Sequence, residues 1–377
     1  MELFSLGRLN LWREGILIDD GKEIINYGED NLYPQRAKTA TLRSPLVKSG
    51  IGLIADFLEG SGFETPIDEP INSHGHTDND LLKLVSEDLS LYNGFAILVN
   101  MDGEGKNKNY FSIPFEWIRY AKTEKDGRIK DVYVSNQWSA LGSSVENAQK
   151  YPLILPGEAL DSLNAPSGAI FYYTGLRQQY PLARMDAIFD TAQADAGVQT
   201  FEFSNINNGF LSATIFKHYG GFKSDKERQK FADNVQKFIG AENANSVFVV
   251  DIDEELKDAE LFEQLPANNN DSLFDSTVRN IINRVLQHLR LPVSLMSVTS
   301  DGAVFTQQNI SDDVMLMNER TESDRKVIER VFKALEINDS LIIEKELKVN
   351  NESDSISQPG GAPPVVANVG EPGENEN

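Results

Sequence analysis

The clearest pattern of hydrophobic and polar positions lies between residues 271 and 291. Apolar side chains recur there at steps of three and four residues: Phe274, Val278, Ile281, Ile282, Val285, Leu286 and Leu289. Polar and charged residues fill the positions between them, which is typical of an amphipathic helix. Asp271 or Ser272 is suited to cap its start, and Pro292 cannot continue it. We therefore predict a helix of roughly 20 residues, about 30 Å long, that ends near Leu291.

An earlier stretch predicts a second long helix, which starts after Pro181. The residues that lie along one side of it are Leu182, Met185, Ile188, Phe189, Ala192, Ala196 and Gln199. Asn208 and Gly209 supply a stop signal. Gly197 weakens the middle of this helix by about 1 kcal/mol relative to alanine, which is compatible with a bend there.

The residues between these two helices have a different pattern. Strand-like runs occur near 211–216 and 247–250, and helical spacing occurs between them over 224–239. This order predicts a compact βαβ-like insert that is connected to one long helix at each end.

A stretch of small residues follows Pro292. Its members are Ser297, Val298, Thr299, Ser300, Asp301, Gly302, Ala303, Val304, Phe305 and Thr306. Small side chains and an internal glycine argue against a buried strand, so we predict a loop in which Asp301-Gly302 is either a turn or a functional tip. Ser311-Asp312-Asp313 is a helix start signal, and helical spacing returns over 314–335.

The pattern before the first long helix alternates between helices and strands. Helical spacing occurs over 46–58 and 81–91, and strand-like runs occur over 94–100, 110–114, 117–121, 129–134 and 169–173. Asp78 is the expected cap of the helix over 81–91. Asp126-Gly127 predicts a hairpin, and residues 136–168 are rich in loop signals. We expect an α/β block with a largely antiparallel sheet.

Composition and charge exclude several classes of protein. The 377 residues include 35 Lys and Arg against 58 Asp and Glu, a formal net charge of −23, which disfavours tight wrapping of nucleic acid on a basic surface. Cysteine is absent, so disulfides and thiol chemistry are excluded. We find no apolar run of 18 residues and no signal-peptide pattern, and expect neither membrane insertion nor secretion. Residues 351–377 are acidic and rich in Pro and Gly, which predicts disorder.

Familiar enzyme signatures are missing from the sequence, among them G-x-x-x-x-G-K-[ST], H-E-x-x-H and G-x-S-x-G. We therefore expect no catalytic residue, no cofactor and no metal. His74-Gly75-His76, with Asp78 and Asp80, offers two imidazoles and two carboxylates to one cation, or else forms a polar loop without a ligand.

Two further groups of charged residues have alternative interpretations. The acidic run Asp251, Asp253, Glu254 and Glu255 is a solvated loop or, if it lines a pocket, a carboxylate pair for acid-base chemistry. The polar side of the helix over 271–291 carries Arg279, Arg284 and Arg290. These arginines serve either salt bridges between helices or contacts with phosphate.

The order of elements resembles the portal proteins of tailed bacteriophages, the head-tail connectors. That family is built as wing, stem helix, clip, stem helix, tunnel loop and a following long helix. Four local stretches are also similar: Tyr27-Gly28-Glu29-Asp30-Asn31-Leu32-Tyr33-Pro34, Asn207-Asn208-Gly209, Asn243-Ala244-Asn245 and His288-Leu289-Arg290-Leu291-Pro292. The resemblance covers most of residues 26–336, and the order of the stretches carries more weight than any one of them.

This resemblance implies an α+β portal fold. Its parts are an α/β wing over 1–180, stem helices over 181–209 and 271–292, a small α/β clip over 210–270, a tunnel loop over 293–310, a wing or crown helix over 311–345 and a disordered acidic tail over 346–377. Residues 297–306 then face the DNA channel, and Arg279, Arg284 and Arg290 belong to the stem.

The resemblance also implies a role and partners. The role is that of a ring, usually of twelve subunits, at one capsid vertex of a virion assembled in the host cytoplasm, through which double-stranded DNA is packaged and ejected without sequence-specific binding. The implied partners are the terminase large subunit, a head-tail adaptor, and the major capsid and scaffold proteins. An acidic ring suits this role, because each phosphate neutralised by Lys or Arg would strengthen the grip on DNA. The alternatives are another capsid assembly or scaffold protein, and a carboxylate-dependent hydrolase.

Overall fold

The structure is a computed structural model. It describes residues 23–101, 108–125, 128–138, 145, 147–154, 168–175, 180–207, 214–219, 224–227, 229–230, 233, 247–252, 262–264, 271–296 and 307–346. All the helices and strands below belong to one compact unit, Met1–Lys345. Predictions for the tail over 351–377 and for the loop over 297–306 lie outside the described residues.

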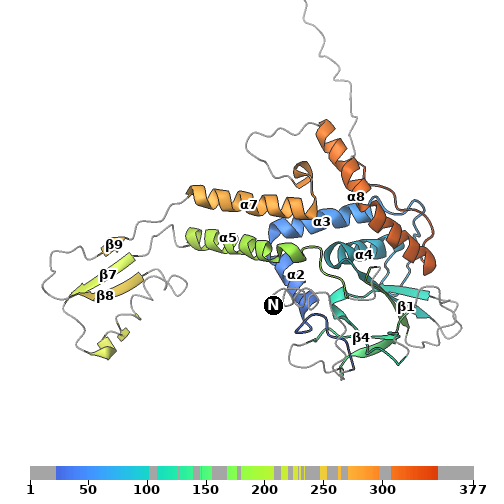
Figure 1. The fold of residues 1–377 in the computed structure, drawn as a ribbon, viewed down its shortest axis with the longest axis horizontal. Coiled ribbons are helices and arrows are strands. Elements are labelled where there is room, and N and C mark those ends of the chain that lie inside the picture. Colours follow the sequence, from blue (N-terminus) through green and yellow to red (C-terminus); the bar gives the residue numbers. More distant parts are fainter. Residues whose placement is uncertain are drawn as a thin grey trace, which may run out of the picture. The chain divides into compact units, whose positions relative to one another are not determined.

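Helices provide most of the described structure. They are α2 (Tyr33–Arg43), α3 (Pro45–Glu59), α4 (Asp78–Tyr92), α5 (Phe189–Asn207), α7 (Asp271–Leu289) and α8 (Gln307–Ala334), with the short 3-10 turns η1 (Phe115–Trp117), η3 (Asp186–Ile188) and η6 (Val293–Met296). Figure 1 shows α3, α5 and α7 beside one another, and these three helices contact each other pairwise. Every described helix is either too short or too polar to serve as a transmembrane segment.

The strands form three small sheets. They are β1 (Phe95–Met101), β2 (Lys108–Ser112), β3 (Ile118–Tyr120), β4 (Asp131–Val134), β5 (Gln149–Pro152), β6 (Ala169–Tyr173), β7 (Thr214–Tyr219), β8 (Val247–Ile252) and β9 (Phe262–Gln264). The orders β2-β1-β6 and β3-β4-β5 are antiparallel throughout. In β8-β7-β9, β7 pairs parallel with β8 and antiparallel with β9. The fold is α+β.

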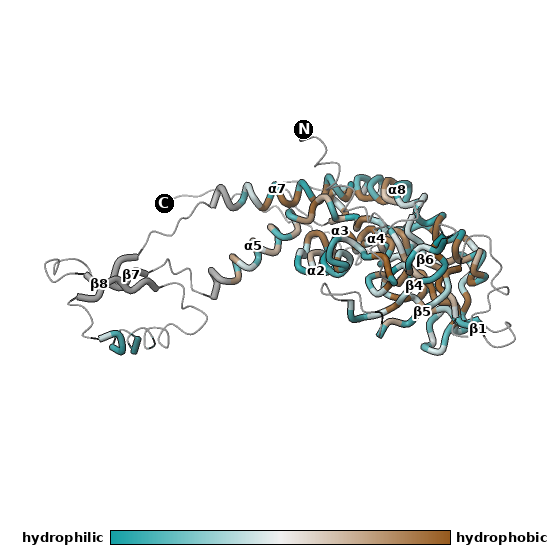
Figure 2. The backbone as a smooth tube through the Cα atoms, turned by 60° about the horizontal axis from the view of Figure 1, so that its bottom comes forward, coloured by the Kyte–Doolittle hydropathy of each residue, from teal (hydrophilic) through white to brown (hydrophobic). Residues whose placement is uncertain are grey.

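The hydrophobic core lies where α3 and α4 meet the strands. Val47, Leu58, Leu81, Leu82 and Val85 are fully buried on these helices. Helix α3 packs against α4, and α4 packs against β1 and β2. These helical residues share one core with the buried residues of β1 and β6, and Figure 2 shows hydrophobic stretches gathered in this region. Apolar residues at helical spacing on α3 and α4 are thus buried by packing against other elements, which is the usual source of helix stability in proteins.

Most predicted elements are confirmed. The helix over 46–58 is α3, the strand over 94–100 is β1, the strand over 169–173 is β6, and the helix over 271–291 is α7. The two strands flanking Asp126-Gly127 pair antiparallel as a hairpin predicts, and the parallel pair β7 and β8 fits the βαβ-like insert. Helix α2 and the strands β5 and β9 were not predicted, because their runs are short or follow turn-rich sequence.

The predicted cap of α4 is wrong. Thr77 is the N-cap: its hydroxyl accepts from the Asp80 amide, and the Asp80 carboxylate accepts from the Thr77 amide 2.9 Å away. Asp78 is instead buried, where its carboxylate accepts from the Ile67 amide and the Asn338 side chain. Both residues suit a cap, and a capping box satisfies two backbone donors rather than one.

Two helix starts are also wrong. Helix α5 begins at Phe189 and not after Pro181, because residues 182–184 are bonded to the end of α4: the Leu182 carbonyl accepts from the Asn93 side chain, and the Arg184 amide donates to the Leu91 carbonyl. Helix α8 begins at Gln307, so the start signal at residues 311–313 lies inside it.

Candidate functional site

The predicted loop at residues 297–306 is bounded by described structure on both sides. Helix α7 ends where Arg290 adopts a left-handed conformation with φ of 56°, and the Leu291 amide donates to the Leu286 carbonyl at 2.9 Å. This six-to-one hydrogen bond is the Schellman cap. Pro292 follows and prevents the helix from continuing. The chain therefore turns sharply off α7 just before the loop.

Close packing on α3 fixes this corner. A Cβ atom added to Gly50 would lie 2.8 Å from the Cδ1 atoms of both Leu289 and Leu291, and 3.9 Å from Cε of Met296. Any larger residue at this position would require the side chains of Leu289 and Leu291 to shift, so glycine suits the close approach of α7 to α3. The predicted loop range of 293–310 is too wide, because η6 occupies 293–296 and α8 starts at Gln307.

Helix α8 holds the same corner from another side. The Ser294 hydroxyl donates to the Asp313 carboxylate, and the Arg320 guanidinium donates to the Arg290 carbonyl. The two ends of the loop are thus tied together by hydrogen bonds between the α7–η6 corner and the first half of α8. Both flanks of residues 297–306 are therefore firmly anchored.

Arg184 joins α7 to two other helices. Its carbonyl lies 2.8 Å from Nε2 of His288 on α7, and its Nε donates to the Ser90 carbonyl of α4 at 3.1 Å. Its Nη2 forms an ion pair with Asp324 of α8 at 2.9 Å. One partly buried residue therefore connects α4, α7 and α8 near the start of α5.

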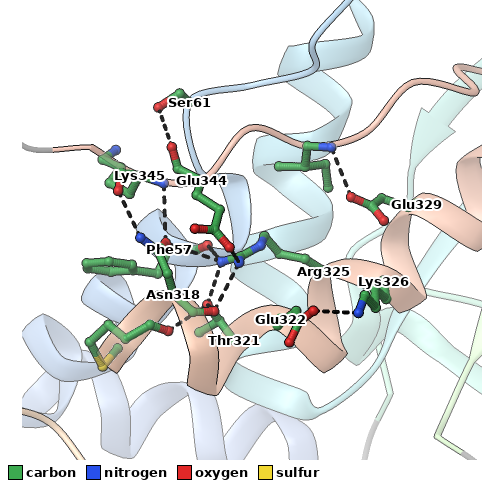
Figure 3. A network of polar contacts seen from close by, with 12 residues as sticks. Phe57, Ser61, Asn318, Thr321, Glu322, Arg325, Lys326, Glu329, Glu344 and Lys345 are labelled. Atoms are coloured by element: carbon green, nitrogen blue, oxygen red, sulfur yellow. Dashed lines mark hydrogen bonds and ion pairs between the residues drawn. The ribbon is translucent and has the colours of Figure 1, made fainter. Parts of the chain in front are cut away.

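A buried arginine fixes the middle of α8. Arg325 is 3% exposed and donates to the Phe57 carbonyl at 3.1 Å, to Thr321 at 2.8 Å and to the Glu344 carboxylate at 2.9 Å. Figure 3 shows this network linking α3, α8 and the segment around Glu344. Asn318 adds a bond from its side chain to the Lys345 carbonyl at 2.9 Å.

The stretch from Tyr27 to Pro34, singled out from the sequence, forms a tyrosine stack. The ring of Tyr27 lies 4.1 Å from that of Tyr180 and 5.4 Å from that of Tyr33, centroid to centroid. The Tyr33 hydroxyl donates to Asp186 at 2.7 Å and accepts from the Ala183 amide at 2.9 Å. The stretch therefore holds the segment that leads into α5.

Arg119 closes this stack from the sheet side and was not predicted. It is fully buried, and its guanidinium donates to both oxygens of Asn31, to the Gln35 side chain and to the carbonyls of Glu116 and Ile118. Burial lowers the pKa of Arg119, while neighbouring tyrosines and Glu116 oppose that shift. An arginine in a strand-like run is normally exposed, so no local signal reveals this role.

The predicted arginines lie at the surface. Arg279 and Arg284 are exposed on α7, and Arg290 is exposed just after its end. Helix geometry separates Arg279 from Arg284 by about 140°, so these two do not share one face. Arg284 forms no ion pair with any described residue. The choice between salt bridges and phosphate contacts for these arginines stays a prediction.

The histidine cluster at residues 74–80 is described in full by the structure, whereas the acidic run at residues 251–255 is described only in part. The rings of His74 and His76 are 5.7 Å apart, but Asp78 and Asp80 serve the turn before α4 and its cap. No group of three or more His, Asp or Glu side chains within the described ranges is arranged to hold a metal ion. Asp251 lies in β8, and residues 253–255 fall outside the description.

Comparisons with known proteins give structural similarities only. No protein-family model and no curated protein matches this chain. A chain in the neck of a native gene transfer agent particle, computed with C12 symmetry, aligns with a TM-score of 0.48 and 12% identity, covering 86% of this chain and 84% of that one. A chain in the neck of the empty particle, computed with C6 symmetry, aligns with a TM-score of 0.49 and 12% identity, covering 86% of this chain and 85% of that one. An HK97 family phage portal protein from Corynebacterium diphtheriae aligns with a TM-score of 0.44 and 11% identity, covering 74% of this chain and 85% of that one.

Proposed function

We propose that this chain is a portal protein, which forms a ring at one vertex of a phage-like capsid and serves as the conduit for double-stranded DNA. In this proposal α5 and α7 are the stem, the sheet of β7, β8 and β9 belongs to the clip, and residues 297–306 are the tunnel loop. The terminase large subunit and the head-tail adaptor are the proposed docking partners, and the virion is the proposed location.

One observation carries the proposal. Helices α5 and α7 lie against each other, the chain between them contains a separate parallel strand pair, and α7 ends in a capped corner anchored on α3 and α8 immediately before the loop. A conduit needs a firm base for the segment that meets the duplex. Gly50, the Schellman cap and the bond from Ser294 to Asp313 provide it.

Charge supports the same role. A DNA duplex carries one negative charge per about 1.7 Å, and this chain has more carboxylates than cations, 58 Asp and Glu against 35 Lys and Arg. Serine, threonine, glycine and alanine dominate residues 297–306, and such side chains make weak contacts. A polyanion can slide past a surface of this kind, because few of its phosphates are neutralised and little binding free energy is gained from counterion release.

Two measurements test the proposal. Light scattering on the purified chain should give a particle of roughly 500 kDa, as expected for twelve copies of 42.0 kDa in a closed ring. Deleting residues 299–304 should leave the number of subunits in the particle unchanged and reduce the amount of DNA packaged in an assembly reaction. A loop-shortened chain that packages DNA as well as the parent chain would contradict the conduit role.

A further inference from the structure

A groove between α2 and α5 has no occupant in the described chain. Its volume is about 1090 Å³, and apolar side chains on its walls include Leu32, Ala40, Phe189 and Ala196. Phe203, which also lines it, is 66% exposed. A large aromatic side chain left in water at the wall of an apolar groove is typical of an interaction surface.

The charged side chains lining the groove are both basic. They are Arg36 and Arg43, and no Asp or Glu is among the lining residues. Arg36 pairs with Asp30, whereas Arg43 is exposed and forms no ion pair within the described part of the chain. The groove therefore suits an apolar element that is flanked by carboxylates.

Helix α8 presents such an element on its surface. Met315 and Leu316 are 62% and 36% exposed, and the exposed carboxylates of Asp312 and Glu319 flank them. The spacing 312, 315, 316, 319 places all four on one face of the helix. We call these four residues the α8 stripe.

We propose that the α2–α5 groove receives the α8 stripe of a second copy of this chain. The pairing matches an apolar wall with Met315 and Leu316, and Arg43 with a carboxylate such as Glu319. Groove and stripe are different surfaces of one protomer, so each copy offers both, and such a contact closes into a ring when its rotation allows. This inference rests on the proposed ring and names the contact between its subunits.

Filling the groove gives the first test. A Cβ added to Gly197, a groove residue, meets nothing within 4 Å, so the backbone tolerates a side chain here and Gly197→Trp places an indole at the groove wall. We expect it to raise the concentration for half-assembly at least tenfold, about 1.4 kcal/mol, with the circular dichroism spectrum unchanged. Gly52→Trp on α3 is the matched control, since Gly52 is also an open helical glycine, and it should assemble normally.

A charge exchange gives the second test. Arg43→Glu should weaken assembly about tenfold, and the double variant Arg43→Glu with Glu319→Arg should return to within about threefold of the parent chain, because opposite charges again face each other across the contact. Failure of the double variant to recover would overturn the assignment of the stripe. Normal assembly of Gly197→Trp would overturn the groove while leaving the ring proposal intact.

A single label identifies the occupant. The chain has no cysteine, so Gln193→Cys in the groove can carry one fluorophore. We expect the label to become shielded from a collisional quencher only as protein concentration rises through assembly. Shielding that is independent of concentration and lost on deleting residues 1–22 would mean that the chain's own N-terminal segment fills the groove, which overturns the proposal. A parent chain that never self-associates would overturn both this contact and the ring.

Discussion

At the scale of single residues, Asn31 and Arg119 connect parts of the chain that are 88 residues apart. Asn31 adopts a left-handed conformation with φ of 59°, which asparagine tolerates better than most residues. Its side-chain oxygen accepts from the Tyr27 amide at 3.0 Å and from Arg119 Nε at 2.5 Å. The turn and the buried cation therefore stabilise each other.

Replacing Arg119 should strongly destabilise the folded protein. Arg119→Met fills similar space but removes every hydrogen bond that the guanidinium donates to Asn31, Gln35, Glu116 and Ile118, so we expect a loss of roughly 3 kcal/mol or more in the free energy of unfolding. Urea denaturation measures it. Lys130→Met, which breaks the exposed ion pair with Glu124, is the control and should cost less than about 1 kcal/mol. Equal losses in the two variants would show that Arg119 contributes no more than a surface cation.

The raised pKa of Asp88 should make the stability of the fold depend on pH. Burial and the neighbouring Glu116 carboxylate raise the pKa of Asp88 well above its usual value, and Lys38 and the Phe115 amide only partly oppose this. A raised folded pKa gives stability that is complete below the unfolded pKa and lost as pH rises through the folded one. Asp88→Asn should therefore melt at a higher temperature than the parent chain at pH 8, with the difference vanishing towards pH 4.

Asp80 supplies the control of opposite sign. Hydrogen bonds from the Thr77 amide and hydroxyl lower the pKa of Asp80, so its contribution is present above the unfolded pKa and lost as pH falls through the folded one. Asp80→Asn should melt at a lower temperature than the parent chain at pH 8, with the gap closing as the pH falls. If both variants shift melting in the same direction at pH 8, the stated cause for Asp88 is wrong.

At the scale of elements, the corner after α7 depends on the absence of a side chain at Gly50 of α3. Three apolar side chains, those of Leu289, Leu291 and Met296, lie over Gly50, where any Cβ would intrude. A helix interior normally favours other residues over glycine by up to about 1 kcal/mol. The close approach of α7 to α3 explains why glycine is nevertheless suited to this position.

Filling this position should destabilise the fold. Gly50→Leu forces the leucines of the corner out of place, and overpacking of this kind costs about 1–3 kcal/mol in the free energy of unfolding. Gly52→Leu, two residues away on the same helix and in open space, should be neutral or stabilising by up to about 1 kcal/mol. Thermal and urea denaturation of the pair measure the difference, and equal stabilities would argue against tight packing at the corner.

At the scale of the whole molecule, the proposed ring multiplies every charge in its channel. One substitution in the loop adds about twelve charges around the axis if the ring has the proposed copy number. The function of the loop is therefore sensitive to sign as well as to size. The loop carries the Asp301 carboxylate and no Lys or Arg, so it does not attract the phosphates of the duplex, whereas an added cation would.

Adding one cation to the loop should slow transport. Ser300→Lys places a ring of ammonium groups at the proposed constriction, and each phosphate neutralised strengthens binding by counterion release. We expect a lower packaging rate, with purified rings retaining DNA in a strongly salt-dependent manner. Ser49→Lys on the exposed side of α3 is the control and should package normally. An unchanged rate for Ser300→Lys would contradict a channel position for this loop.

Local pattern was sufficient for α3, α7, β1 and β6, because a period of 3.6 or 2 residues depends only on near neighbours in the chain. The Pro292 stop and the glycine-containing loop signal are equally local. These features led to the resemblance and to the order of parts. The arginines proposed from sequence for the stem, Arg279, Arg284 and Arg290, lie at the surface, and Arg279 and Arg284 do not share one face of α7.

Tertiary structure alone decided which residues hold these elements together. Arg119 reaches Asn31, Arg184 reaches Asp324, and Arg325 reaches the Phe57 carbonyl across 268 residues. The start of α5 moved to Phe189 because the end of α4 binds the residues before it, and the α2–α5 groove exists only once both helices are packed. Such contacts depend on how distant segments close on one another, and the free energy of that packing is absent from any local pattern.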